Sequence, residues 1–272
     1  LSGIVLGGLV LLAILTNEIL TFRKFQQEAM QTQASQKFVA YQDMLKVLQE
    51  QALRQAALFA SLPEVFACYE IAHQGNINDE NDPHMQQARE KIRAVLKSNL
   101  KSFQIITGKK FKLHYHLPNG RSLVRLWRKK QTKRNGVWVD ISDDISSFRQ
   151  TVLDVNRLGQ PVVGIEIGRG GFVIRGLAPV KKNGRQLGSV EVLLSFDPVL
   201  KTSANEKELF LLMNKDKLSV ARKLKDRPVV GNFVVVKGKH TDLLQPLMQQ
   251  HLLEAARQKL INYLKDNKIG RA

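Results

Sequence analysis

The chain begins with an apolar segment that has the pattern of a helix. Residues 1–15 carry no charge and a single hydroxyl side chain. Fifteen helical residues rise about 22 Å, which is short of the roughly 30 Å hydrocarbon core of a bilayer, but extension through residues 16–20 makes the span adequate. We therefore expect a transmembrane helix over residues 1–22. A cleaved signal peptide and a buried core helix are the alternatives.

The next segment is rich in Gln, Glu, Ala, Lys and Leu, and it contains no proline before Pro63. Its apolar residues recur at helical spacing, which predicts a stalk helix over residues 23–60, about 60 Å long. Such a stalk usually pairs with a second copy, so we expect a homodimer, although its later half could instead cover a sheet. Two more helices are expected, at residues 61–73 and 84–108, with a polar loop between them.

From Lys110 the apolar residues alternate with polar ones, which is typical of strands. Asn-Gly pairs provide turns between some of these strands. The order of elements predicts an α+β domain in which helices cover one face of a PAS-like antiparallel sheet. The expected strands and helices after Lys110 are strands 111–117 and 121–127, a helix 140–156, strands 160–167, 172–180 and 185–196, then strand 208–213, a helix, strand 231–238 and a helical tail 242–265.

Composition adds one strong feature, a basic excess. The 272 residues include 42 Lys or Arg and 24 Asp or Glu, which gives a formal charge of +18 at pH 7. Such an excess favours polyanions, anionic lipid headgroups or acidic small molecules, without choosing among them. Cys68 is the single cysteine, so an internal disulfide is impossible.

Four segments in order carry a family resemblance. They are residues 114–128 (HYHLPNGRSLVRLWR), 143–156 (DDISSFRQTVLDVN), 162–180 (VVGIEIGRGGFVIRGLAPV) and 183–197 (NGRQLGSVEVLLSFD). Together they resemble the double Cache sensor domains of bacterial methyl-accepting chemotaxis proteins and sensor histidine kinases. The basic stretch 129–142 departs from the family, where a short loop containing proline is expected.

The resemblance implies a receptor in the bacterial inner membrane with its sensing region in the periplasm. It implies a membrane-distal Cache lobe over residues 61–200 and part of a membrane-proximal lobe over residues 201–272. The function expected from it is that of a chemoreceptor region that binds a small molecule. A histidine-kinase or diguanylate-cyclase sensor and a membrane-anchored polyanion-binding protein are the alternatives, and no output module is expected within this chain.

A sensor pocket needs a few convergent polar groups in a largely apolar cleft. Arg125 and Trp127 share one face of a strand, where the guanidinium could hold a carboxylate while the ring covers its apolar part. Asp143, Asp144 and Arg149 lie at the helix expected to cover the sheet. The two carboxylates could take an ammonium group or could cap that helix.

Further candidates lie on the strands that follow. Glu166, Arg169 and Arg175 belong to or flank one hairpin, where Glu166 and Arg175 could contact the ligand or pair with each other. His116 shares a strand face with His114, and two such histidines can join a metal site. No third ligand is apparent in the sequence, so no metal and no cofactor are expected.

Other patterns favour structural interpretations. Residues 168–171 (GRGG) lack the following helix that would complete an anion site, so a hairpin turn is expected. Seven of the fourteen residues from 121 to 134 are basic, which fits a solvated loop better than a surface for lipid or nucleic acid, and no nucleic-acid partner is expected. The sequence shows no nucleophile elbow, phosphate loop or triad, so an enzyme is not expected.

Overall fold

The computed structural model describes residues 2–202, 210–238, 244–249 and 258. The chain forms two compact units, residues 1–46 and residues 47–272. A single helix, α1 (Ser2–Ala60), provides the first unit and enters the second, as expected for residues 23–60. Its apolar run gives way to Thr16, Asn17 and Glu18. Among the described residues no helix has a stretch long and apolar enough to cross a membrane, so the transmembrane helix expected over residues 1–22 is not confirmed.

Two helices follow α1 close to their expected positions. Helix α2 (Pro63–Ala72) begins with a proline in its first turn, where the missing N–H costs nothing. Helix α3 (Pro83–Thr107) begins after Asp82, whose carboxylate accepts hydrogen bonds from two backbone N–H groups of the first turn. Gly108 ends α3 in the left-handed conformation, with φ of 68°.

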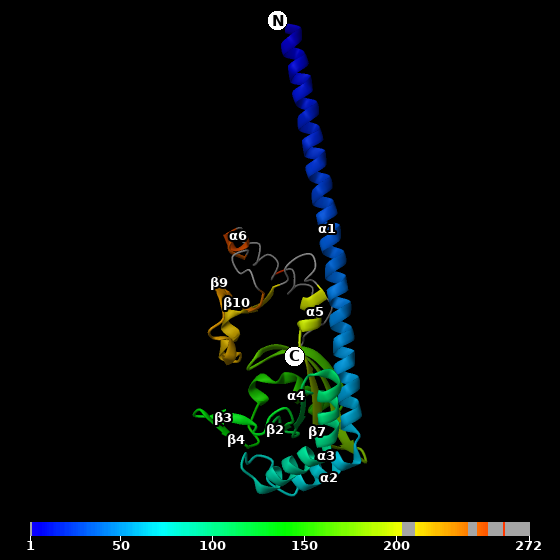
Figure 1. Ribbon diagram of the computed structural model, residues 1–272, viewed down its shortest axis with the longest axis vertical. Coiled ribbons are helices and arrows are strands. Elements are labelled where there is room, and N and C mark those ends of the chain that lie inside the picture. The colour runs from blue at the N-terminus through cyan, green and yellow to red at the C-terminus, as the bar shows by residue number, and fades with distance from the viewer. Residues whose placement is uncertain (1, 203–209, 239–243, 250–257, 259–272) are drawn as a thin grey trace. The chain divides into compact units, whose positions relative to one another are not determined.

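The central element of the second unit is a five-stranded antiparallel sheet in the order β2-β1-β7-β6-β5. Its strand β7 lies beside the last turns of α1 (Figure 1). Strand β1 pairs with β7, far along the chain, as well as with its hairpin partner β2. The five strands are β1 (Leu113–His116), β2 (Ser122–Arg125), β5 (Val162–Gly168), β6 (Gly171–Lys182) and β7 (Arg185–Leu194).

One face of this sheet carries the main hydrophobic core, formed with α2, α3 and the end of α1. Val190 and Val192 of β7 point into it, together with Ala52 and Ala56 of α1. Helix α4 (Gln150–Leu158) covers part of the opposite face, where Val152 packs with Leu177 of β6. The prediction of helices on one face was therefore wrong, because α4 lies on the other side of the sheet.

The helix expected over residues 140–156 begins later. The backbone of the segment before it pairs with other elements instead: Asp143 accepts from the N–H of Ser122, and Ile145 donates to Gly120. These bonds hold residues 142–145 beside β2 in a non-helical conformation. Helix formation starts with the short 3-10 helix η1 (Ser146–Phe148) and continues in α4.

The family resemblance predicts a short loop in place of the basic stretch 129–142, and the basic residues of segment 121–134 were expected to form a solvated loop. The structure instead has a β-hairpin within 129–142, and segment 121–134 contains β2 and the first strand of that hairpin. Strand β3 (Thr132–Arg134) pairs with β4 (Val137–Val139). Asn135 and Gly136 connect them with φ of 47° and 81°, the positive values that a tight two-residue hairpin turn requires.

The described part of the C-terminal region forms a three-stranded sheet in the order β8-β10-β9. The helix expected between its strands is replaced by two 3-10 helices. Residues 208–209 of the expected strand, and residues 242–243, 250–257 and 259–265 of the expected helical tail, lie outside the described residues. Leu224 and Val236 pack against Ile167 and Phe172 of the larger sheet. The elements are α5 (Asp197–Thr202), β8 (Leu211–Asn214), η2 (Lys215–Ser219), η3 (Arg222–Leu224), β9 (Val229–Val230), β10 (Phe233–Lys237) and α6 (Leu244–Gln249).

Candidate functional site

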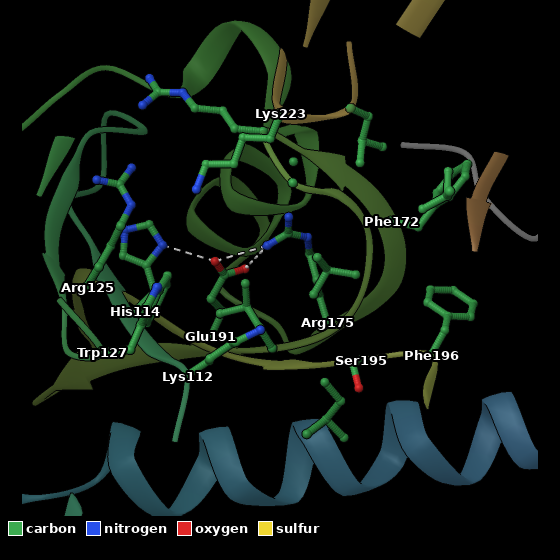
Figure 2. A pocket seen from close by; sticks show the side chains of 18 of the residues that line it. Lys112, His114, Arg125, Trp127, Phe172, Arg175, Glu191, Ser195, Phe196 and Lys223 are labelled. Atoms are coloured by element: carbon green, nitrogen blue, oxygen red, sulfur yellow. Dashed lines mark hydrogen bonds and ion pairs between the residues drawn. The ribbon is translucent and has the colours of Figure 1, made fainter. Parts of the chain in front are cut away.

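A cavity of about 500 Å³ lies against the face of the larger sheet opposite the main core. Its walls come from β1, β2, β6, β7 and η1, and from η3 and β10 of the C-terminal region. Its apolar surface includes the rings of Trp127, Phe172 and Phe196 (Figure 2) and that of Phe148, together with aliphatic side chains. A cavity of this size, with apolar walls and convergent polar groups, is typical of small-molecule sites.

Most of the charged side chains that line the cavity are positive. Glu191 and Asp197 are the acidic side chains of the lining. Nine cationic side chains oppose them: Lys112, Arg125, Arg128, Arg149, Arg169, Arg175, Lys223, Arg227 and Lys237.

Glu191 is the centre of a buried ionic network at the wall of the cavity. Its side chain is fully buried, and Arg149 donates to one carboxylate oxygen while Arg175 donates to both, at 3.1 and 3.2 Å. Glu166 accepts from Nε of Arg149 at 2.6 Å and lies 3.5 Å from Nε of Arg175. Burial alone would raise the pKa of Glu191, but Arg149 and Arg175 hold that pKa well below its usual range. The carboxylate is therefore ionised and saturated with donors.

Two buried histidines complete this network. Nδ1 of His114 lies 3.0 Å from Oε1 of Glu191 and 2.9 Å from Nε2 of His116. Ser122 and Ser189 contact the remaining ring nitrogens at 2.8 and 3.3 Å. Burial lowers the pKa of both histidines, and it takes the pKa of His114 well below its usual range. Both rings are therefore neutral at pH 7.

The same three groups could be metal ligands. One ligand atom from each of His114, His116 and Glu191 lies within 4.8 Å of the other two, so the sequence interpretation missed Glu191 as a third donor. Arg149 and Arg175 already neutralise this carboxylate. A divalent cation here would add uncompensated positive charge in a buried position, which is unfavourable. The contacts thus favour a hydrogen-bonded network over a metal centre.

A second ion pair closes the wall formed by β2. Arg125 donates to both oxygens of Asp143, at 2.6 and 3.2 Å. Arg169 approaches the same carboxylate at 3.5 Å and donates to Oγ1 of Thr132 at 2.8 Å. Asp143 is fully buried behind these two guanidiniums and offers no free oxygen toward the cavity.

The comparisons with known proteins identify the family of this chain. The model of a double Cache family, described as the double sensory domain of two-component sensor kinases, matches residues 27–258. The chain belongs to this family. Double Cache domains are extracytoplasmic sensor domains of membrane receptors, and they bind small ligands. No curated protein matches the sequence.

Solved double sensor structures show modest similarity. The sensor domain of the V. cholerae histidine kinase DctB is 11% identical with a TM-score of 0.46, over 70% of this chain and 65% of that domain. This chain therefore spans less than two thirds of the DctB domain. The ligand-binding domain of the Campylobacter jejuni chemoreceptor Tlp3 in complex with L-valine is 15% identical with a TM-score of 0.33, over 77% of this chain and 77% of that domain.

Five of the residues singled out in the sequence line the cavity of this double Cache domain: Arg125, Trp127, Arg149, Arg169 and Arg175. The four others do not belong to its lining. Asp143 and Glu166 form ion pairs with lining arginines, and His116 is fully buried beneath Glu191. Asp144 is exposed and accepts from the N–H of Ser146 two residues on; the N-cap positions of η1 and α4 are Ile145 and Arg149, so Asp144 does not occupy the N-cap of either helix.

Sequence reasoning missed several lining residues. Glu191 stands alone between apolar neighbours in a strand, which is itself a signal of a buried, paired carboxylate. Arg128 was counted among the basic residues of segment 121–134, and nothing in the local pattern separates it from Lys129 and Lys130. Lys223 joins the cavity through tertiary contacts that no local pattern indicates.

Proposed function

We propose that this chain is the ligand-sensing region of a bacterial transmembrane receptor, and that its ligand binds in the cavity described above. The observation that carries this proposal is the composition of the cavity walls. The larger sheet provides one wall, and η3 and β10 provide another. A ligand in this position contacts both sheets at once, so binding can change how they pack.

The contacts between the two sheets offer a path for the signal. Arg169, in the turn between β5 and β6, accepts a hydrogen bond from the backbone N–H of Lys223 at 3.0 Å. Leu224 packs on the same hairpin. A ligand shifts a signalling equilibrium only through its different affinity for two states. Side chains that move with the β5-β6 hairpin are positioned to make the affinity for the ligand differ between the two signalling states.

The output is proposed to be a histidine kinase, because the family description names two-component sensor kinases. The chemoreceptor output expected from the sequence is the alternative. Membranes that contain the full-length receptor should form acid-labile phosphohistidine from ATP if the output is a kinase. Ligand-dependent methylation of glutamate side chains without phosphohistidine would favour the chemoreceptor. We further propose that the sensing region is periplasmic, dimeric and without enzymatic activity.

A thermal-shift screen of the full chain in mild detergent tests the proposed cavity. Organic acids, amino acids and amines are screened against the native chain, Trp127→Ala and Phe25→Ala. Trp127 lines the cavity, whereas Phe25 is an exposed aromatic side chain of α1 outside the lining, which makes it a control for the loss of an aromatic ring. At a ligand concentration of 100 Kd, binding should raise Tm by about 5–10 °C.

A sensing cavity predicts a shift in the native chain and in Phe25→Ala that is lost in Trp127→Ala. Stabilisation only by heparin or nucleic acid, abolished by salt and equal in all three proteins, would instead favour the polyanion-binding alternative.

A further inference from the structure

The charges of the cavity narrow the class of ligand, on the assumption that the cavity is the sensor site. Each of the acidic groups that face it is already held by a cation. Glu191 is bound by Arg149 and Arg175, and Asp197 lies 2.7 Å from Nζ of Lys237. Within the described part of the chain, the lining thus offers no unpaired carboxylate for an ammonium group.

Several lining cations, in contrast, have no acidic partner. Among the residues that the structure describes, Lys112, Arg128, Lys223 and Arg227 form no ion pair with a carboxylate. They occur on both walls: Lys112 and Arg128 flank β1 and β2, while Lys223 and Arg227 belong to the segment around η3. Figure 2 shows the side chain of Lys223 directed toward the same opening as Arg125 and Arg175.

Arg128 shows how strongly positive this space is. Its guanidinium lies over Trp127 and Trp138, at 5.4 and 5.5 Å from the ring centroids, and donates to the backbone carbonyl of Gln131. Burial, together with the charges of Arg125 and Arg169, lowers the pKa of Arg128 to about 10. An anionic group beside Arg128 would relieve this repulsion, whereas a cation would increase it.

We propose that the cavity takes a small organic anion with at least two carboxylate or phosphate groups and no ammonium group. One anionic group is held by Arg128 and Lys112, and the other by Lys223 and Arg227 on the opposite wall. The rings of Trp127 and Phe172 cover the carbon skeleton between them. Such a ligand forms ion pairs with cations of both walls at once. An amino acid adds an ammonium group, for which the described lining has no unpaired carboxylate.

Isothermal titration of the full chain in detergent tests this with matched probes. Glutarate has two carboxylates, L-glutamate adds an ammonium group to the same skeleton, and cadaverine is the diamine of the same carbon number. Citrate and 3-phosphoglycerate extend the set to a larger anion and to a phosphate. The best anion should bind at least tenfold more tightly than L-glutamate, and cadaverine should not bind.

Arg128→Gln and Lys223→Gln should each raise Kd for that anion by about tenfold to a hundredfold, as expected for loss of one charged hydrogen bond. Lys130→Gln is the control, because Lys130 is an exposed neighbour outside the lining; its Kd should stay within twofold of native. Lys223 is exposed, so Lys223→Gln should fold. This variant therefore tests the anion site if Arg128→Gln does not fold.

The outcomes separate this inference from the proposed function. Tighter binding of L-glutamate or cadaverine than of glutarate, dependent on Trp127, overturns the ligand class and leaves the sensing cavity intact. Equal weakening by Lys130→Gln overturns the site, because it shows general attraction to a basic surface. If no small molecule of any charge binds, the sensing cavity and its ligand class both fail.

Discussion

Glu191 allows a sharp test of the buried network. Glu191→Gln keeps the shape of the side chain and removes its charge. Arg149 keeps Glu166 as a partner at 2.6 Å, but Arg175 is left with the same carboxylate at 3.5 Å. Removal of one partner from a buried ion pair costs about 3–5 kcal/mol, because the remaining charge stays buried without compensation. We expect the free energy of unfolding to fall by about that amount.

Urea denaturation at pH 7.5 measures this change, followed by the fluorescence of the two tryptophans, Trp127 and Trp138. The double variant Glu191→Gln/Arg175→Met should recover part of the loss, because it removes the unpaired guanidinium. A loss below about 1 kcal/mol for Glu191→Gln, with no recovery in the double variant, would refute the reasoning, since it would mean that water already solvates these charges.

Two other regions give testable changes. A Cβ at Gly176 would lie 2.1 Å from the backbone nitrogen of Leu53, so Gly176→Ala should push α1 from β6 and cost about 1–3 kcal/mol in urea denaturation; an unchanged midpoint would contradict this packing. The pKa values of His114 and His116 are lowered by burial, so between pH 7.5 and 5 the unfolded state binds protons that the folded state does not. The free energy of unfolding should therefore decrease as the pH is lowered from 7.5 to 5, by up to about 2 kcal/mol per histidine. A free energy of unfolding that does not change with pH, in the native chain and in His114→Gln alike, would contradict this.

Local patterns predicted much of the secondary structure. The helical spacing of apolar residues predicted a helix over residues 84–108, and the structure has α3 at Pro83–Thr107. Alternating residues predicted β1, β2, β6 and β7 to within a few residues. These features succeed because each depends on neighbours in sequence. The helix predicted over residues 142–145 was wrong for the opposite reason, since the backbone there forms hydrogen bonds with residues 120 and 122.

The site was predicted in part. Arg125 and Trp127 were found because strand alternation places them on one face. The sequence could not show that Arg125 forms an ion pair with Asp143, since that pair depends on how the segment after the β3-β4 hairpin returns to β2. Nor could it place Lys223 at the cavity, because that contact requires the packing of one sheet on another.

The pairing of β1 with β7 has a consequence for how the domain forms. Tyr115 lies opposite Val190, so the centre of the sheet closes a loop of many residues. Until β7 is available, β1 can pair only with β2, and an isolated two-stranded hairpin is marginally stable at best. Sheets built on such distant contacts fold slowly. The five-stranded sheet should therefore stay incomplete through most of the synthesis of the domain. It should form in a late step, once β7 has emerged as far as Leu194 and can pair with β1.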